Sequence, residues 1–67
     1  MTVNERLKIY LKDHGIKQQF LAEKLGIGHS KVSRMLNGDR KITAEEIGNI
    51  AKVLNVSTDI FFENYVR

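Results

Sequence analysis

Residues Gln18–Gly38, QQFLAEKLGIGHSKVSRMLNG, decide the fold of this 67-residue chain. Their apolar side chains recur at helical spacing on both sides of a Gly-Ile-Gly junction at residues 26–28. This spacing predicts one helix over about residues 18–25 and a second over about residues 29–36. Ala22 is a small residue shortly before the junction, and small residues there allow two helices to approach closely at a steep angle. The stretch therefore predicts two short helices joined by a tight turn.

One further helix is expected before this stretch, over about residues 4–13, where apolar residues recur at i, i+3 and i+4. Asn4 is placed to cap this helix by accepting a hydrogen bond from a free backbone N–H. The helix is expected to end at His14, because the following Gly15 adopts the left-handed conformation of a C′ residue at low cost.

Two more helices are expected after the opening stretch. The first covers about residues 44–54 and begins with a capping box, in which the Thr43 side chain bonds forward and the Glu46 side chain bonds back. The second covers about residues 58–64, with Ser57 as its N-cap. No segment has a convincing strand pattern. We therefore expect an all-α fold of five short helices that forms a single domain over the whole chain, residues 1–67.

Composition narrows the class of protein. The chain has no cysteine and no proline, and 42% of its residues are apolar. Disulfides are therefore absent, no Cys/His set suits a structural metal, and a chain this short must rely on efficient helix packing or self-association. No apolar run resembles a signal peptide or approaches the ~20 residues of a membrane span. We expect a soluble, cytoplasmic protein that needs no metal or cofactor.

Positive charge is concentrated in and around the opening stretch. The formal net charge of the chain is +3. Residues 17–41 hold six basic and two acidic side chains, whereas residues 42–67 hold two basic and four acidic ones. A polyanionic partner is therefore expected to meet residues 17–41. The alternative is that this asymmetry is only a solvated face.

One register of small, polar and apolar residues extends over about residues 4–63. Its members are Gln18, Leu21-Ala22, Leu25-Gly26, Val32, Asn37-Gly38, Ile50-Ala51, Leu54, Val56-Ser57 and Phe61. In this register the chain resembles the Cro/lambda-repressor type of helix-turn-helix domain, the XRE family of bacterial and phage regulators. The resemblance implies a compact lambda-repressor-like fold with the helix-turn-helix at its second and third helices. It also implies sequence-specific binding of double-stranded DNA by a transcriptional regulator, most commonly a repressor.

The resemblance further implies that the helix over residues 29–36 lies in the major groove. His29 and Ser30 then stand at the first reading positions, with Arg34 one turn later. Independently, the apolar residues of this helix must face the core, which turns four polar residues outward: Ser30, Ser33, Arg34 and Asn37. Arg34 has the planar fork that matches guanine O6 and N7, and His29 can donate to a purine. A polar helix surface of this kind can also be merely solvated.

Contacts to DNA phosphates are expected from residues on this helix and on both sides of it: Lys17, Gln18, Lys31, Asn37, Arg40 and Lys41. Lys31 can alternatively reach a base through its long side chain. Gln18 resembles the family glutamine that binds phosphate and supports the first reading residue. Asn37 and the Arg40-Lys41 loop resemble the family's clamp on the DNA backbone. Contacts of this type set the position of the protein but do not read the sequence. Asn37 can equally be a C-terminal helix residue before Gly38.

Three features depart from the family pattern. Lys17 stands where the N-cap of the second helix is usually Ser or Thr, which loses a cap of ~1 kcal/mol. Leu11 and Leu36 replace an Arg–Glu pair of some family members, and we expect them to touch. Ile9 and Phe20 occupy positions that are commonly polar. They either form an exposed apolar patch for a partner or cover loosely packed edges of the core.

These features predict a non-enzymatic, nucleoid-associated homodimer on a palindromic operator. The dimer surface is expected at the last helix and chain end, around Phe61, Phe62 and Tyr65. No enzyme is expected, because the chain lacks a Cys nucleophile, a Gly-rich phosphate loop and a metal-spaced cluster, and a fold this small lacks room for a small-molecule pocket. The alternative is a protein-interaction module, such as an antitoxin-like adaptor, on the same fold.

Overall fold

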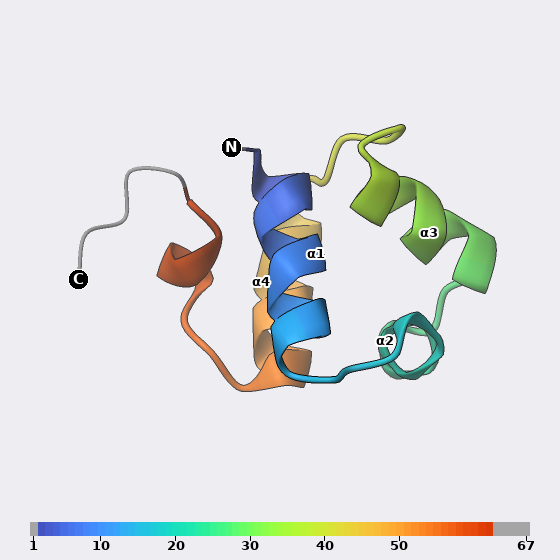
Figure 1. Cartoon of the computed structure of the whole chain (residues 1–67), viewed down its shortest axis with the longest axis horizontal. Helices are drawn as coiled ribbons and strands as arrows, with labels where there is room; N and C mark the ends of the chain where they lie inside the picture. The colour runs from blue at the N-terminus through green and yellow to red at the C-terminus, as the bar shows by residue number, and fades with distance from the viewer. Residues whose placement is uncertain (1, 63–67) are drawn as a thin grey trace.

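In a computed structural model, which describes residues 2–62, the chain forms four α-helices followed by one turn of 3-10 helix (Figure 1). These elements are α1 (Val3–Asp13), α2 (Gln18–Leu25), α3 (His29–Asn37), α4 (Ala44–Leu54) and the 3-10 turn η1 (Thr58–Phe61). No strand occurs within the described residues. The all-α class is confirmed, and the bounds predicted for the first four helices agree with the observed ones to within one residue.

The prediction of a fifth α-helix over residues 58–64 is not confirmed. The Ser57 side chain caps the start as expected, accepting from the Asp59 N–H at 3.2 Å. The backbone then forms a 3-10 turn, and Phe62 adopts an extended conformation that ends it. β-Branched Thr58 and Ile60 favour α-helix only weakly, because their side chains lose rotamer freedom against the preceding turn. Residues 63 and 64 lie outside the described part of the chain.

The start of α1 also differs from the prediction, which assigned its N-cap to Asn4. Thr2 is the N-cap instead, and it forms a capping box with Glu5. The same T-x-x-E spacing marks the start of α4, where the predicted box of Thr43 and Glu46 is confirmed. Asn4 is thereby displaced into the first turn of α1, and its side chain is available for contacts elsewhere in the fold.

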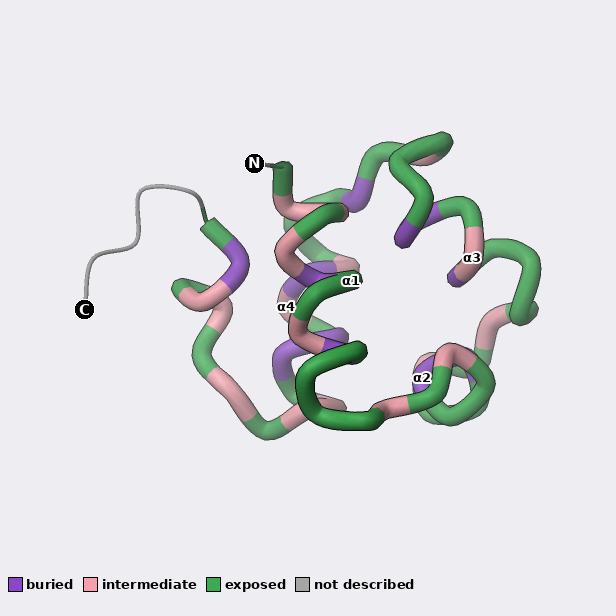
Figure 2. Tube along the Cα trace, viewed as in Figure 1, coloured by how far each residue is buried: buried purple, intermediate pink, exposed green. Residues whose placement is uncertain are grey.

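α3 packs against α1 and α2, α2 also packs against α4, and η1 contacts α1 and α4. Figure 2 shows that the buried residues gather where these elements face one another. Tyr10 and Phe61 meet edge to face with ring centroids 6.1 Å apart, which attaches η1 to α1. The buried apolar side chains are Leu7, Leu11, Leu21, Ala22, Val32, Met35, Leu36, Ile42, Ile47, Ile50, Ala51 and Phe61.

Leu11 and Leu36 both belong to this core, and each side chain is almost fully buried. They come from α1 and α3, which pack together. Burial of both residues agrees with an apolar pair in place of the Arg–Glu pair of some family members, and their direct contact stays a prediction.

A glycine ends each of the two helices α2 and α3. Gly26 ends α2 with φ of 70°, and Gly38 ends α3 with φ of 83°, both in the left-handed region. Residues with a side chain adopt this region only at a cost of about 1 kcal/mol or more. Gly48 is different, because it lies inside α4, and a Cβ built there meets no other heavy atom within 4 Å. No close approach within the described chain accounts for this glycine.

We expect Gly48→Ala to raise the free energy of unfolding by about 0.5–1 kcal/mol, because alanine restricts the unfolded chain and meets no clash in α4. Gly26→Ala is the matched control and should lower it, because alanine is strained at a positive φ. Urea unfolding followed by circular dichroism measures both. A loss of stability in Gly48→Ala would contradict this account.

Candidate nucleic-acid interface

The two faces of α3 differ sharply in character. Val32, Met35 and Leu36 are buried in the core. His29 and Arg34 are exposed on the outer side. Of the other residues predicted to face outward, Ser30 and Asn37 are exposed and Ser33 is half-buried. Lys31 beside them is exposed as well. The helix therefore presents a polar face that includes the cationic side chains of Lys31 and Arg34. Its position is set by the opposite, apolar face.

Arg34 is the strongest candidate for contact with a base edge. Among residues 2–62, the structure gives it neither an ion-pair partner nor a side-chain hydrogen bond. Its guanidinium therefore keeps its donors for a ligand. His29 and Ser30 occupy the first turn of α3, where Gly28 is the N-cap and supplies no side-chain bond. The start of the helix is thus open to solvent, as an element that enters a DNA groove requires.

The flanking residues form the borders of this face. Lys17 is the N-cap residue of α2 and makes no side-chain cap bond, as predicted. Gln18 is half-buried at the first position of α2. Lys41, in the loop between α3 and α4, is exposed. These positions place polar or cationic groups before α2, along α3 and after α3.

Arg40 differs from what the sequence predicts for a phosphate contact. Its guanidinium forms a two-point ion pair with Glu46, through Nη1 at 3.0 Å and Nη2 at 2.8 Å. Nη1 also donates to the carbonyl oxygen of Lys41 at 3.3 Å. Both terminal nitrogens are thus bound within the domain. Arg40 ties the loop to the start of α4, and Lys41 is the cation that the loop leaves exposed.

Glu46 therefore has two roles, of which the sequence showed only the capping box. The Arg40 guanidinium, followed by the Thr43 backbone N–H, lowers the pKa of Glu46 to about 2. Arg40 and Glu46 are six residues apart and lie on different elements. No helical or strand spacing brings such a pair together, so only the course of the loop reveals it.

Asn4 is a second residue whose role the sequence did not indicate. Its Nδ2 donates to the carbonyl oxygen of Met35, in the last turn of α3, and to that of Arg40 at 2.9 Å. The start of α1 is thereby joined to the end of α3 and to the following loop. The partners are 31 and 36 residues from Asn4 in sequence, so no local pattern predicts them.

The expected dimer surface needs correction at Phe61. This side chain is only 2% exposed and belongs to the core of its own domain, so it presents no surface to a partner. Phe62 is 42% exposed, as a contact residue would be. Tyr65 lies outside the described residues.

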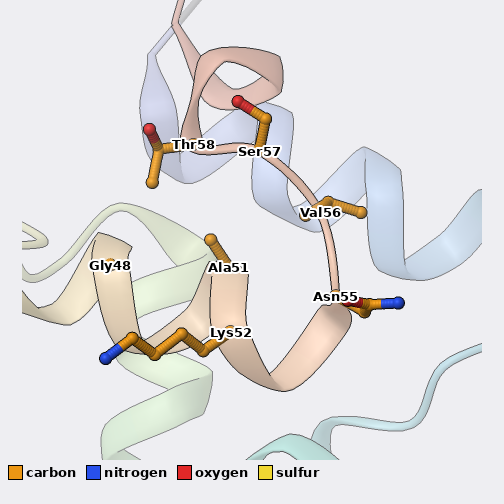
Figure 3. A pocket seen from close by; sticks show the side chains of 7 residues that line it. All are labelled: Gly48, Ala51, Lys52, Asn55, Val56, Ser57 and Thr58. Atoms are coloured by element: carbon orange, nitrogen blue, oxygen red, sulfur yellow. The ribbon is translucent and has the colours of Figure 1, made fainter.

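An open groove of ≈ 500 Å³ lies between α4 and the start of η1 (Figure 3). Its volume corrects the expectation that so small a fold has no room for a small molecule, although the groove is open to solvent. Figure 3 shows Gly48 and Ala51 on α4 with Ser57 and Thr58 across from them.

Within residues 2–62, no three side chains of metal-binding type form a cluster, and no helix is long and apolar enough to cross a bilayer.

The all-helical fold agrees with the comparisons. A family model described as helix-turn-helix matches residues 7–61. The chain belongs to the XRE type of this helix-turn-helix family. The match extends from the first turns of α1 to the end of η1, so it covers nearly all the described structure. The resemblance stated from the sequence is confirmed.

Two curated relatives share this domain. Uncharacterized HTH-type transcriptional regulators from Sinorhizobium medicae (strain WSM419) and Rhizobium meliloti (strain 1021) are each 31% identical over 62 residues. The aligned region is 92% of this chain but 45% of each relative. The chain thus spans less than half the length of these helix-turn-helix relatives. No solved structure gives a significant match.

The ion pair of Glu46 makes a pH-dependent contribution to stability. Its pKa is lower in the folded chain than the usual 4.5, so the stabilisation is full above about pH 4.5 and is lost as the pH falls toward about 2. We expect Glu46→Gln to unfold at lower urea concentration near neutral pH. This difference from the unsubstituted protein should shrink as the pH is lowered.

The measurement is urea unfolding by circular dichroism, over the pH range in which both proteins fold. Glu45→Gln is the matched control, because Glu45 is exposed on the same turn of α4 and has no part in the ion pair. A difference between Glu46→Gln and the unsubstituted protein that stays constant with pH would contradict the assignment.

Proposed function

We propose that this chain is the sequence-specific, double-stranded-DNA-binding domain of a transcriptional regulator, with α3 in the major groove. The observation that carries the proposal is the outer face of α3, where exposed His29, Ser30 and Arg34 stand opposite a buried apolar face. A helix held in this way can enter the ~12 Å wide groove without disturbing the core. Membership of a DNA-binding helix-turn-helix family supports the same function and argues against an enzyme.

Each polar side chain on the outer face of α3 makes a different contact with the base edges of the major groove. Arg34 donates two hydrogen bonds to O6 and N7 of a guanine, a geometry that its planar fork matches. His29 donates one bond to a purine acceptor. Ser30 and Ser33 can donate or accept, and each adds little discrimination alone. Arg34 therefore supplies most of the specificity at one base pair of each half-site.

Contacts to phosphates hold the helix in position. Lys17 and Gln18 meet the backbone on one side of α3, whereas Asn37 and Lys41 meet it on the other side. Lys31 reaches the backbone from α3 itself. Since Arg40 is paired with Glu46, it acts on the shape of the loop and not through a phosphate.

The domain acts as a homodimer on a palindromic operator at the nucleoid, with half-site centres ~34–36 Å apart. A single small module binds DNA weakly, and a second copy provides the missing affinity. Exposed Phe62 supports a dimer surface on the C-terminal side of the domain. Repression follows most simply, because a bound dimer blocks access of the polymerase.

A second candidate function is a protein-interaction module on the same fold. Ile9 and Phe20 favour it, because each keeps 43% of its surface exposed. The two functions are separated by binding to a pool of random duplexes, measured by fluorescence anisotropy at several salt concentrations. DNA binding predicts measurable affinity at low salt that falls steeply as salt rises, because phosphate contacts release counterions. No binding even at low salt would exclude the first function and leave the second.

We expect Arg34→Ala to cost about 1–3 kcal/mol of binding free energy on the preferred site and little on random duplex. The preferred site comes from selection out of the random pool. Lys41→Ala is the contrasting variant, because it removes a phosphate contact. Lys41→Ala should weaken binding to the preferred site and to random duplex by the same factor. It should also reduce the slope of log affinity against log salt concentration by about 0.9. Equal losses on both duplexes in Arg34→Ala would show that Arg34 also contacts only phosphate.

A further inference from the structure

Side chains hydrogen-bond to the backbone of the loop between α3 and α4. One of them comes from α1 and the other from the loop itself. Asn4, from α1, donates to the carbonyl oxygens of Met35 and Arg40. The Arg40 guanidinium donates to the carbonyl oxygen of the next residue, Lys41, and is itself held by Glu46 of α4. We call Asn4, Arg40 and Glu46 the clasp. The clasp joins α1, the end of α3, the loop and α4 around one short segment.

The Asn4 carboxamide is well matched to this position. Both of its neighbours are carbonyl oxygens, which only accept, so the –NH₂ end must face them. The two N–H groups of that end serve the two acceptors. One acceptor, the Met35 carbonyl oxygen, lies in the last turn of α3, where it also accepts a hydrogen bond of 3.4 Å from the N–H of Gly38. The half-buried carboxamide thus adds a second hydrogen bond at the end of α3 and joins this end to the loop beside it.

Two candidate DNA contacts stand on the segment that the clasp holds. Asn37 is the last residue of α3, and Lys41 follows directly after Arg40. Both side chains are exposed. A lysine contributes most to binding when its backbone is already in position, because ordering a loop during binding costs affinity. The clasp removes that cost before DNA arrives.

We propose that Asn4 is a positioning residue for DNA binding: through the clasp it fixes the backbone from which Lys41 reaches a phosphate. This inference rests on the proposed function. Asn4 lies on α1, outside the helix-turn-helix, and contacts no DNA itself. Its effect on affinity should therefore pass through Lys41, and that coupling separates a positioning role from a structural one.

The test is a double-mutant cycle of Asn4→Ala and Lys41→Ala, with binding to duplex DNA measured between about 50 and 200 mM salt. Each phosphate contact contributes a factor of about 3.5 to the drop in affinity between these two salt concentrations. We expect most of this factor to be missing in Asn4→Ala, so that its affinity falls less steeply with salt than that of the unsubstituted protein. The double variant should bind no worse than Lys41→Ala alone.

Thr2→Ala is the matched control. It removes the N-cap of the same helix and so lowers stability, but it removes no side chain of the clasp. It should keep the full salt dependence when measured at a temperature at which the protein is folded. Additive effects of Asn4→Ala and Lys41→Ala, or an unchanged salt dependence in Asn4→Ala, would overturn the inference and leave the proposed function standing. Absence of duplex binding by the unsubstituted protein would overturn both.

A measurement on the unsubstituted protein covers the case in which Asn4→Ala does not fold. If the clasp fixes the segment in advance, the backbone amide of Lys41 in the free protein should have an NMR order parameter near that of rigid backbone, about 0.85. A value below about 0.6 would mean a flexible loop and would overturn the inference.

Discussion

Burial of one side of α3 is the constraint on which the rest of the structure depends. A nine-residue helix is too short to be stable alone in water, so α3 forms because Val32, Met35 and Leu36 are covered by the rest of the domain. Once these side chains face inward, helical geometry decides where the others point. The outward direction of Arg34 and the contact of α3 with α1 and α2 are therefore two results of the same packing.

Most of the fold could be predicted from the sequence, because its helices have local signals at both ends. Gly26 and Gly38 end α2 and α3, and the capping box at Thr43 starts α4. The same box at Thr2 is ambiguous in the sequence because Asn4 is also a good cap, and only the packed structure shows the Asn4 side chain engaged elsewhere. The structure has only a 3-10 turn after Ser57, because a cap marks where a helix begins and not how far it continues.

The candidate site was predictable where it depends on helical period and not where it depends on the course of the loop. The outward residues of α3 follow from its spacing. The pairing of Arg40 with Glu46 does not, nor do the bonds of Asn4, because these residues meet only after the chain has folded. Phe61 shows the same limit, since an aromatic residue near a chain end can serve as core or as contact surface. Composition does not distinguish the two.

Placement of α3 in the major groove is the central claim, and methylation interference on the selected duplex tests it most directly. Methylation of guanine N7 alters the major groove, whereas methylation of adenine N3 alters the minor groove. The account predicts that N7 methylation at one or more guanines of each half-site prevents binding, and that one of these effects disappears in Arg34→Ala. Interference confined to adenine N3, with guanine N7 positions silent, would contradict it.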